Sequence, residues 1–255
     1  MPAETRLFLC LKDNYGVLLH DPDTGATASI DAPEAAPIEE ALKATGWNLT
    51  DILVTHHHHD HTAGIVTLKQ KYGCRVVAPA KEANKIPEVD RTVHQGEMVS
   101  VGNLTAKVID TPGHTLGHVT YWFAADHLAF VGDTLFSIGC GRVIEGTPEM
   151  MWSSLKKLRE LPNETEIFCG HEYTAANIKF ALTIDADNPV LEARAAQVQQ
   201  LLAEGAPTIP VTIGDEKLAN PFLRADVADL ACDVGMAGKP PEQVFAVIRE
   251  KKNRF

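Results

Sequence analysis

The segment 55–61, with the sequence Thr-His-His-His-His-Asp-His, gathers metal-binding side chains more densely than any other part of the chain. It follows the apolar run 51–54, which predicts a buried strand that ends where the histidines begin. A purification tag would lie at a terminus, whereas this cluster is internal and is interrupted by an aspartate. Short histidine-rich tracts are otherwise typical of metal binding, so the ordered pattern H-x-H-x-D-H predicts a metal site.

The spacing within this segment predicts which side chains act together. Side chains alternate along an extended strand, so His56 and His58 point to one side and His57 points to the other. Asp60 and His61 lie beyond the strand end, where a turn can direct them to a second ion. The segment therefore predicts half of a site for two metal ions.

Three other loops each carry one more potential ligand directly after a predicted strand. They are Thr-Pro-Gly-His at 111–114, Gly-Asp-Thr at 132–134 and Gly-His at 170–171. Imidazole and carboxylate together suit zinc or iron, whereas calcium prefers oxygen ligands alone. The predicted ligand set is His56, His58, Asp60, His61, His114, Asp133 and His171.

This set divides evenly between two ions if Asp133 bridges them. The first ion would be held by His56, His58, His114 and Asp133, and the second by Asp60, His61, His171 and Asp133. A bridging water or hydroxide, held by the catalytic residues Asp60 and Asp133, would then attack the substrate. We expect hydrolysis with two divalent ions per chain, zinc first, with iron or manganese as alternatives.

Composition limits the partners of the protein. The chain has 255 residues, 45% hydrophobic and 22% charged, which is typical of a globular enzyme. Its formal net charge of −11 disfavours binding to nucleic acid or to an anionic membrane surface. No run approaches the ~18 apolar residues of a membrane span, and residues 1–4 do not begin a secretory signal. We expect a cytoplasmic monomer that acts on a small molecule.

The cysteines and the remaining histidines are expected to be structural. The five cysteines are scattered without a C-x-x-C pair, which indicates neither a disulfide framework nor a thiolate metal site, and we expect most to be reduced and buried. His118 is a loop histidine that could lie close to the metals, although we assign it no role. Three histidines without a partner in sequence are expected at the surface: His20, His94 and His127.

Alternating apolar residues and turn signals predict the elements that must position the ligands. Predicted strands lie at 7–10, 15–20, 26–30, 51–54, 75–78, 98–101, 104–110, 119–123, 127–131 and 166–169. Predicted helices lie at 35–45, 63–72, 148–161, 175–186, 191–204 and 242–252. Because helices dominate only after residue 172, we expect a catalytic α/β domain at 1–172 and a helical domain at 173–255.

Six motifs carry a resemblance to a known family. They are T-H-x-H-x-D-H from Thr55, T-P-G-H-T from Thr111, G-D-T-L-F from Gly132, C-G-x-x-x-E-G-T from Cys140, C-G-H-E-Y-T from Cys169 and R-x-x-K-N-x-F from Arg249. Together they resemble the motifs of glyoxalase II, the hydroxyacylglutathione hydrolases of the metallo-β-lactamase fold. The ligand motifs would fit many hydrolases of this fold, whereas the last three point to this family.

The resemblance implies a fold, a reaction and a substrate site. The fold would be an αββα sandwich followed by a helical domain at 173–255 that helps to bind glutathione. The reaction would be hydrolysis of S-D-lactoylglutathione to D-lactate and glutathione, a step of methylglyoxal detoxification. The residues that match the glutathione-binding positions of the family are Arg142, Tyr173, Arg249 and Lys252.

The two C-terminal cations can be interpreted in two ways. Arg249 and Lys252 are three residues apart on a predicted helix, so they share a face on which they could hold one carboxylate of glutathione. Without the resemblance, the less favoured alternative is that they are solvated cations, which the helix dipole favours at a C-terminal end.

One position departs from the family pattern. Many members have an aromatic residue, often tyrosine, two positions after the loop cation, where this chain has Ile144. A lost hydrogen bond of this kind is worth about 0.5–1.5 kcal/mol, so we expect weaker binding of glutathione or a different thiol carrier.

Some roles and some functions stay open at the level of sequence. Asp31 either orients a ligand imidazole or caps a turn, and of His57 and His59 we expect one to pack and the other to line the pocket. The alternative functions are a persulfide dioxygenase with one iron, a noncatalytic binding module and an RNA phosphodiesterase. The intact dinuclear ligand set and the C-terminal cations disfavour the dioxygenase, the retention of all seven ligands disfavours the binding module, and the negative charge disfavours the phosphodiesterase.

Overall fold

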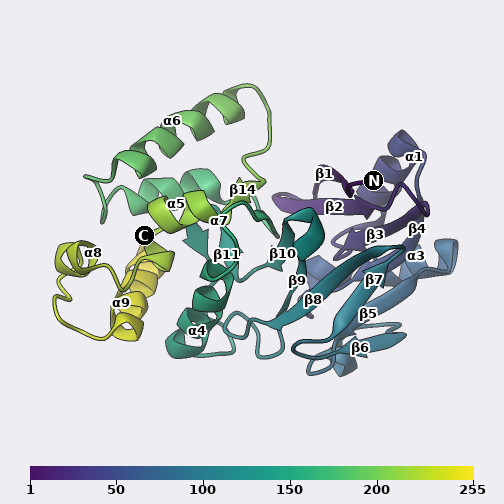
Figure 1. The fold of residues 1–255 in the computed structure, drawn as a ribbon, viewed down its shortest axis with the longest axis horizontal. Coiled ribbons are helices and arrows are strands. Elements are labelled where there is room, and N and C mark those ends of the chain that lie inside the picture. The colour runs from purple at the N-terminus through teal and green to yellow at the C-terminus, as the bar shows by residue number, and fades with distance from the viewer. The chain divides into compact units, whose positions relative to one another are not determined.

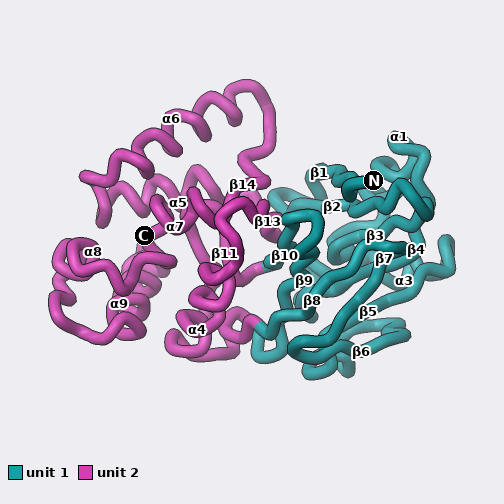
Figure 2. The backbone as a smooth tube through the Cα atoms, in the orientation of Figure 1, with its two compact units in different colours: residues 1–110, 115–132 teal, residues 111–114, 133–255 magenta.

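The computed structural model describes residues 1–255, which form two compact units. Unit 1 comprises residues 1–110 and 115–132, and unit 2 comprises residues 111–114 and 133–255 (Figure 2). This division groups 133–171 with the C-terminal helices. The domain boundary near residue 172 rests on the sequence pattern alone and stays a prediction.

Unit 1 contains a six-stranded sheet in the order β1-β2-β3-β4-β5-β6 (Figure 1). The first three strands pair antiparallel and the last three continue the sheet in parallel. The strands are β1 (Glu4–Cys10), β2 (Asn14–His20), β3 (Ala26–Ile30), β4 (Asn48–Leu53), β5 (Arg75–Pro79) and β6 (Arg91–Val93). Every residue of β2 is buried, as expected for a strand covered on both faces.

Two helices of unit 1 pack on one face of this sheet. Helix α1 (Ala35–Thr45) and helix α3 (Ile65–Tyr72) contribute Ile38, Leu42, Ile65 and Leu68 to one apolar cluster with residues of β2, β4 and β5. Both helices end at a glycine in the left-handed conformation, Gly46 and Gly73, as the sequence predicts. A one-turn helix, α2 (His59–Thr62), precedes α3.

A second, antiparallel group of strands completes unit 1, as predicted. It consists of β7 (Met98–Val101), β8 (Leu104–Asp110), β9 (Val119–Phe123) and β10 (Leu128–Gly132). The hydroxyl of Tyr121 in β9 donates to the carbonyl of Val54, directly after β4, over 2.8 Å. This bond ties the second group of strands to the start of the histidine-rich segment.

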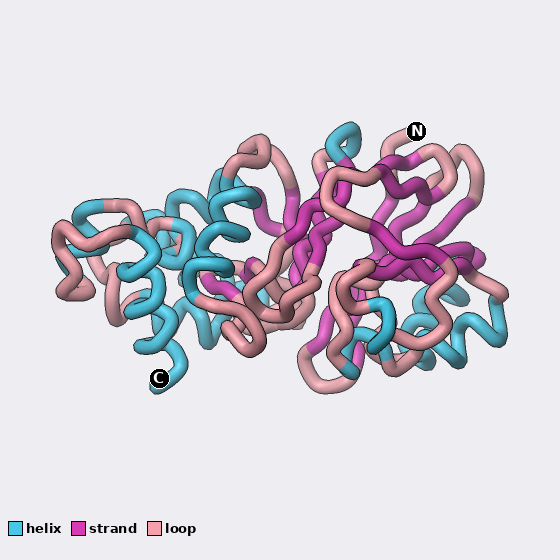
Figure 3. The backbone as a smooth tube through the Cα atoms, turned by 90° about the horizontal axis from the view of Figure 1, so that it is seen from below, coloured by secondary structure: helices cyan, strands magenta, loops and turns pink.

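Unit 2 is mainly helical, as the cyan part of the chain that ends at the C label in Figure 3 shows. Its helices are α4 (Pro148–Arg159), α5 (Thr174–Ala181), α6 (Pro189–Ala203), α7 (Ile213–Ala219), α8 (Ala228–Asp233) and α9 (Pro241–Arg254). Its strands are β11 (Leu135–Phe136) and β12 (Gly139–Cys140), which form a small hairpin, and β13 (Glu166–Cys169), which pairs with β14 (Val211–Thr212). No helix of either unit is long and apolar enough to span a membrane.

The predicted elements are mostly confirmed, and the failures concern short ones. The predicted helix 175–186 ends at Ala181, and α3 begins at Ile65 rather than at 63 because α2 precedes it. The sequence missed β6, β11, β12, β14, α7 and α8, none of which is longer than seven residues. Such elements carry too few residues for a hydrophobic period, and tertiary contacts stabilise them.

Candidate metal centre

Unit 1 holds four of the predicted ligands, His56, His58, Asp60 and His61, on the loop after β4 and on α2. His56 and His61 are almost completely buried, whereas His58 and Asp60 are partly accessible. Because α2 starts at His59, the last two ligands lie on a helical turn rather than on an irregular loop. The change from loop to helical turn at His59 therefore separates the predicted pair His56 and His58 from the predicted pair Asp60 and His61.

Asp31 fixes the protonation of two of these histidines. Its Oδ2 lies 2.7 Å from Nδ1 of His61 and also accepts the hydroxyl hydrogen of Thr55 over 2.8 Å. A carboxylate can only accept, so Nδ1 of His61 carries the proton. The Thr55 oxygen has donated its hydrogen, so at 3.0 Å it accepts from Nδ1 of His56. Both rings thereby keep an unprotonated Nε2, the form that binds metal.

This network resolves the role of Asp31, for which the sequence left two alternatives. Asp31 orients His61 directly and His56 through Thr55, both of them predicted ligands, and it also caps the loop by accepting the backbone N–H of Thr55 over 2.7 Å. Asp31 is itself a non-glycine residue with a φ of 56°, a rarely populated conformation that aspartate tolerates better than most residues. Thr55 is a functional residue that sequence reasoning missed, although it precedes the first histidine of the motif.

The spacing of the ligand atoms in unit 1 fits a metal ion. Nε2 of His56 and Nδ1 of His58 lie 3.2 Å apart, and two nitrogens that bind one tetrahedral ion at ~2.0–2.1 Å would be about 3.3 Å apart. Oδ2 of Asp60 lies 3.8 Å from Nε2 of His61, and the Asn14 amide donates to that same oxygen over 3.3 Å. Asn14 therefore supports Asp60.

Unit 2 holds the other three ligands, His114, Asp133 and His171. Oδ2 of Asp133 lies 3.4 Å from Nε2 of His114 and 3.4 Å from Nε2 of His171. Nδ1 of His114 lies 2.8 Å from the carbonyl of Arg142, which can only accept, so Nδ1 carries a proton and Nε2 is the nitrogen that faces Asp133. Each distance is close to the ~3.3 Å expected between two atoms that bind the same ion.

Close backbone packing holds the unit 2 ligands in place. A Cβ atom on Gly141 would lie 1.9 Å from the carbonyl oxygen of Asp133, so only glycine fits there. Gly113, next to His114, has a φ of 147°, and a Cβ on it would lie 2.8 Å from Met151. His171 stacks on Tyr173 with ring centroids 4.8 Å apart.

The histidines outside the ligand set have separate environments. His57 turns away from His56 and engages the buried Glu82, whose Oε2 lies 2.9 Å from its Nδ1, so His57 supports the loop; sequence gave no signal for Glu82. His59 is exposed, and His118 is buried and stacks on His56. The expectation for His20 is wrong, because it is buried, stacks on Trp47 and hydrogen-bonds with Thr27.

The residues that the resemblance assigns to glutathione differ in exposure. Arg142 and Tyr173 are exposed, whereas Arg249 is only 7% exposed. Nη1 of Arg249 donates to the carbonyl of Cys140 over 2.8 Å, and Nζ of Lys252 donates to the carbonyl of Ala176 over 2.8 Å. The alternative of a fully solvated helix end is therefore wrong for Arg249.

Burial also changes the acid–base properties of this region. Burial, and then the charge of Arg249, lower the pKa of Lys252 to about 8. Burial raises the pKa of the Cys140 thiol to about 11 and that of Cys169 to about 12, so neither is a thiolate at neutral pH. All five cysteines are free and four are buried, as predicted.

Comparison with known proteins adds two family matches. The family described as "Metallo-beta-lactamase superfamily" matches residues 23–171, and the family "Hydroxyacylglutathione hydrolase C-terminus" matches residues 172–255. A protein of Rhodopseudomonas palustris (strain BisA53) named hydroxyacylglutathione hydrolase is 62% identical over 254 residues, which is 100% of both chains.

Solved structures show a similar fold. The ETHE1 protein of Myxococcus xanthus has a TM-score of 0.69 at 24% identity, over 96% of this chain and 89% of that chain. The protein TTHA1623, solved in a di-iron-bound form, has a TM-score of 0.57 at 25% identity, over 67% of this chain and 91% of that chain.

Proposed function

The chain belongs to the hydroxyacylglutathione hydrolases of the metallo-beta-lactamase superfamily, and on that premise we propose that its two groups of ligands form one dinuclear centre that hydrolyses S-D-lactoylglutathione. Membership confirms the predicted fold class, a metallo-β-lactamase fold with a helical C-terminal domain, and the activity of a thioester hydrolase in methylglyoxal detoxification. The ligand assignment, the metal and the substrate contacts are our proposals.

The equal distances from Asp133 carry the proposal of two ions. His114 is assigned to the first ion and His171 to the second, so one carboxylate oxygen 3.4 Å from Nε2 of both supports a ligand that serves both ions. The first ion would use His56, His58, His114 and Asp133, and the second Asp60, His61, His171 and Asp133. The di-iron form of TTHA1623 is consistent with this count.

The chain's own residues prepare the reaction. Asp31 and Thr55 keep the ligand nitrogens of His56 and His61 deprotonated. Asp60 and Asp133 supply the negative charge that would orient an attacking water between the ions. Bound divalent ions, zinc first, would lower the pKa of that water and polarise the thioester carbonyl.

The substrate contacts rest on Arg142, Tyr173, Arg249 and Lys252. Glutathione carries two carboxylates, and the three cations of this set would bind them within a chain of net charge −11. Arg249 is buried and donates to the Cys140 carbonyl. We therefore assign it two roles: it supports the backbone of residues 140–142, and it contributes positive charge. Lys252, which is more exposed, is the better candidate for direct contact with a carboxylate.

The test is steady-state hydrolysis of S-D-lactoylglutathione beside an uncharged acyl thioester, together with elemental analysis. We expect about two ions per chain and a strong preference for the glutathione thioester. The double variant Arg249→Ala with Lys252→Ala should raise KM for the glutathione thioester on the order of tenfold to several hundredfold. The single variant Lys252→Ala keeps the bond from Arg249 to Cys140 and should leave the uncharged thioester little changed. An unchanged KM would contradict the substrate contacts, and one ion at full activity would contradict the dinuclear centre.

We also propose that the enzyme works as a monomer in the cytoplasm. The support is that all five cysteines are free, as is usual in reducing compartments. Cell fractionation and size-exclusion chromatography with light scattering test both points.

A further inference from the structure

The β11–β12 hairpin of unit 2 joins two parts of the proposed site. It follows directly after Asp133 and Thr134, and its register pairs Leu135 with Cys140. At its base, the N–H of Gly141 donates to the carbonyl of Thr134 over 3.2 Å. At its far strand, the Cys140 carbonyl accepts from Arg249. The position of the hairpin therefore affects the ligand Asp133 and the cation Arg249 together.

Two buried side chains of α7 and its C-terminus hold the tip of this hairpin. The Asn220 amide donates to the carbonyls of Phe136 over 3.2 Å and Gly139 over 2.9 Å, and to Oε2 of Glu216 over 2.7 Å. Oε2 of Glu216 in turn accepts the N–H of Ile138 over 2.9 Å. Asn220 and Glu216 are 0% and 1% exposed, so water does not compete for these bonds.

The backbone at the tip is strained, which makes these bonds necessary. Ile138 has a φ of 55°, a region that β-branched residues rarely occupy. Such a conformation is unfavourable and persists only where the surroundings enforce it. The bond from the Ile138 N–H to Glu216 is the local interaction that enforces it.

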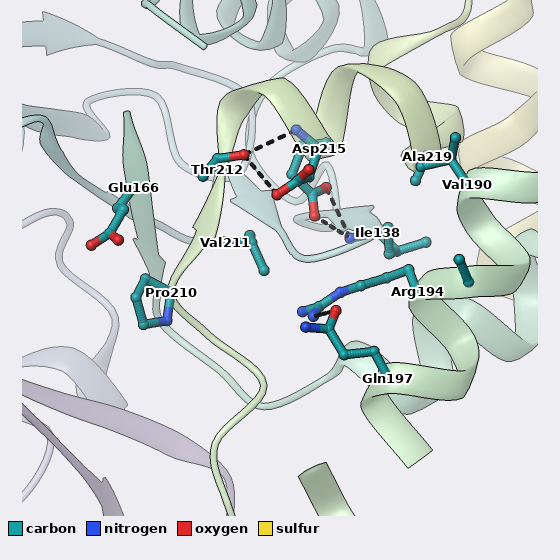
Figure 4. A pocket seen from close by; sticks show the side chains of 12 residues that line it. Ile138, Glu166, Val190, Arg194, Gln197, Pro210, Val211, Thr212, Asp215 and Ala219 are labelled. Carbon is teal, nitrogen blue, oxygen red and sulfur yellow. Dashed lines mark hydrogen bonds between the residues drawn. The ribbon is translucent and has the colours of Figure 1, made fainter. Parts of the chain in front are cut away.

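The surroundings of the tip are only partly packed. The Ile138 side chain joins an apolar cluster with residues of α5, α6 and α7. Ile138 and Glu216 also line a pocket of about 440 Å³, into which Arg194 and Gln197 of α6 extend (Figure 4). The tip therefore borders an apolar cluster on one side and a pocket on another. Burial raises the pKa of Glu216 to about 7, and both of its protonation states keep an acceptor for Ile138.

We propose that Glu216 and Asn220 are positioning residues of the active site, which act through the hairpin to place Asp133 and Arg249. This inference rests on the proposed function, because it takes Asp133 as a metal ligand. Residues that orient metal ligands typically change metal affinity or activity 10- to 100-fold when they are replaced.

A second asparagine of unit 2 provides a matched control. Asn188, like Asn220, is buried, precedes a proline at the first position of a helix and caps that helix with its side-chain oxygen. Its amide donates to Asp185 and to the Leu218 carbonyl, and not to the hairpin. Asn188→Ala and Asn220→Ala should therefore lose similar stability, and only the second should affect the site.

The experiment compares both variants with the wild-type holoenzyme. For Asn220→Ala we expect zinc affinity and kcat/KM to fall roughly 10- to 100-fold, and faster hydrogen–deuterium exchange in residues 134–141. Asn188→Ala should stay within about twofold of wild type in these three measurements. An Asn220→Ala protein with the zinc affinity and hairpin exchange of Asn188→Ala would overturn the inference.

A milder variant, Glu216→Gln, tests the inference even if Asn220→Ala does not fold. If Asn220→Ala does not fold, Glu216→Gln replaces it, because glutamine keeps the volume and one acceptor. We then expect a fall of a few-fold in zinc affinity and faster hairpin exchange, and wild-type values would overturn the inference. Wild-type protein that fails to hydrolyse lactoylglutathione would refute the proposed function alone, since zinc affinity and exchange still report on the hairpin.

Discussion

The two groups of ligands differ in how the chain assembles them. In unit 1, His56, His58, Asp60 and His61 lie within six consecutive residues, and one carboxylate, Asp31, sets the protonation of two of them. In unit 2, His114, Asp133 and His171 come from three separate loops, and backbone packing and a small hairpin hold them. The first group is therefore a local property of the chain, and the second is a property of the tertiary fold.

This difference predicts which substitutions affect one ion and which affect both. A change in unit 1 should act on one ion, because we assign each ligand there to a single ion. A change at Asp133 should act on both ions. Four experiments, ordered from the largest expected effect to the smallest, test this contrast.

Replacing Asp133 should have the largest effect. We expect Asp133→Ala to lose the placement of both ions and to lower kcat by about three orders of magnitude or more, because the shared oxygen is removed. His57→Ala, which removes a histidine that engages Glu82 instead of a ligand, is the control and should keep both ions. Elemental analysis beside the assay decides, and an active Asp133→Ala protein with two ions would refute the bridging role.

Replacing Asp31 tests the local support of unit 1. Asp31→Ala should lower activity or metal affinity roughly 10- to 100-fold, because His61 loses its acceptor and Thr55, the acceptor for His56, loses the carboxylate that orients its hydroxyl. Asp21 provides the control, since it is also buried and also accepts a threonine hydroxyl and backbone N–H groups, but lies on a turn without ligands. If Asp21→Ala lowers metal affinity as much as Asp31→Ala does, the effect is one of stability only.

The pH dependence of KM tests the cations of unit 2. Burial lowers the pKa of Lys252 to about 8, so its charge is lost as the pH rises through that value and its hold on an anionic substrate weakens. We expect KM for lactoylglutathione to rise up to about tenfold between pH 7 and pH 9, and to change less in Lys252→Gln. Folding lowers the pKa of Lys252 below its ordinary value of 10.5, so this group makes the folded state more stable as the pH rises. Unfolding would therefore not explain the rise in KM. If the pH dependence of KM is the same in wild type and in Lys252→Gln, Lys252 does not bind the substrate.

The smallest effect is expected at Ile144. This side chain is 50% exposed, so a larger residue is accommodated there. Ile144→Tyr should lower KM for the glutathione thioester about two- to tenfold by adding a hydrogen bond of about 0.5–1.5 kcal/mol. Ile144→Phe, which adds the ring without the hydroxyl, separates hydrogen bonding from apolar contact. A KM that does not fall in the tyrosine variant would show that this position is remote from the substrate.

The sequence alone determined the residue types of the site and the fold class. The pattern H-x-H-x-D-H sits directly after a strong strand signal, so periodicity and spacing were sufficient to predict a metal site there. The six motifs led to the family, which comparison confirmed. Longer elements such as α1 and α4 were predictable because amphipathic periods and end signals act over many residues.

Only the tertiary structure decided how these residues are supported. Asp31 meets His61 across 30 residues, Glu82 meets His57 across 25 residues and Arg249 meets Cys140 across 109 residues, and no local pattern encodes such pairs. The same holds for the hairpin with Ile138 at its tip, since its two-residue strands have no period and its strained turn exists because Glu216 and Asn220 hold it. Burial has the same origin: Arg249 looks like a surface cation in sequence, and its 7% exposure comes from residues that fold around it.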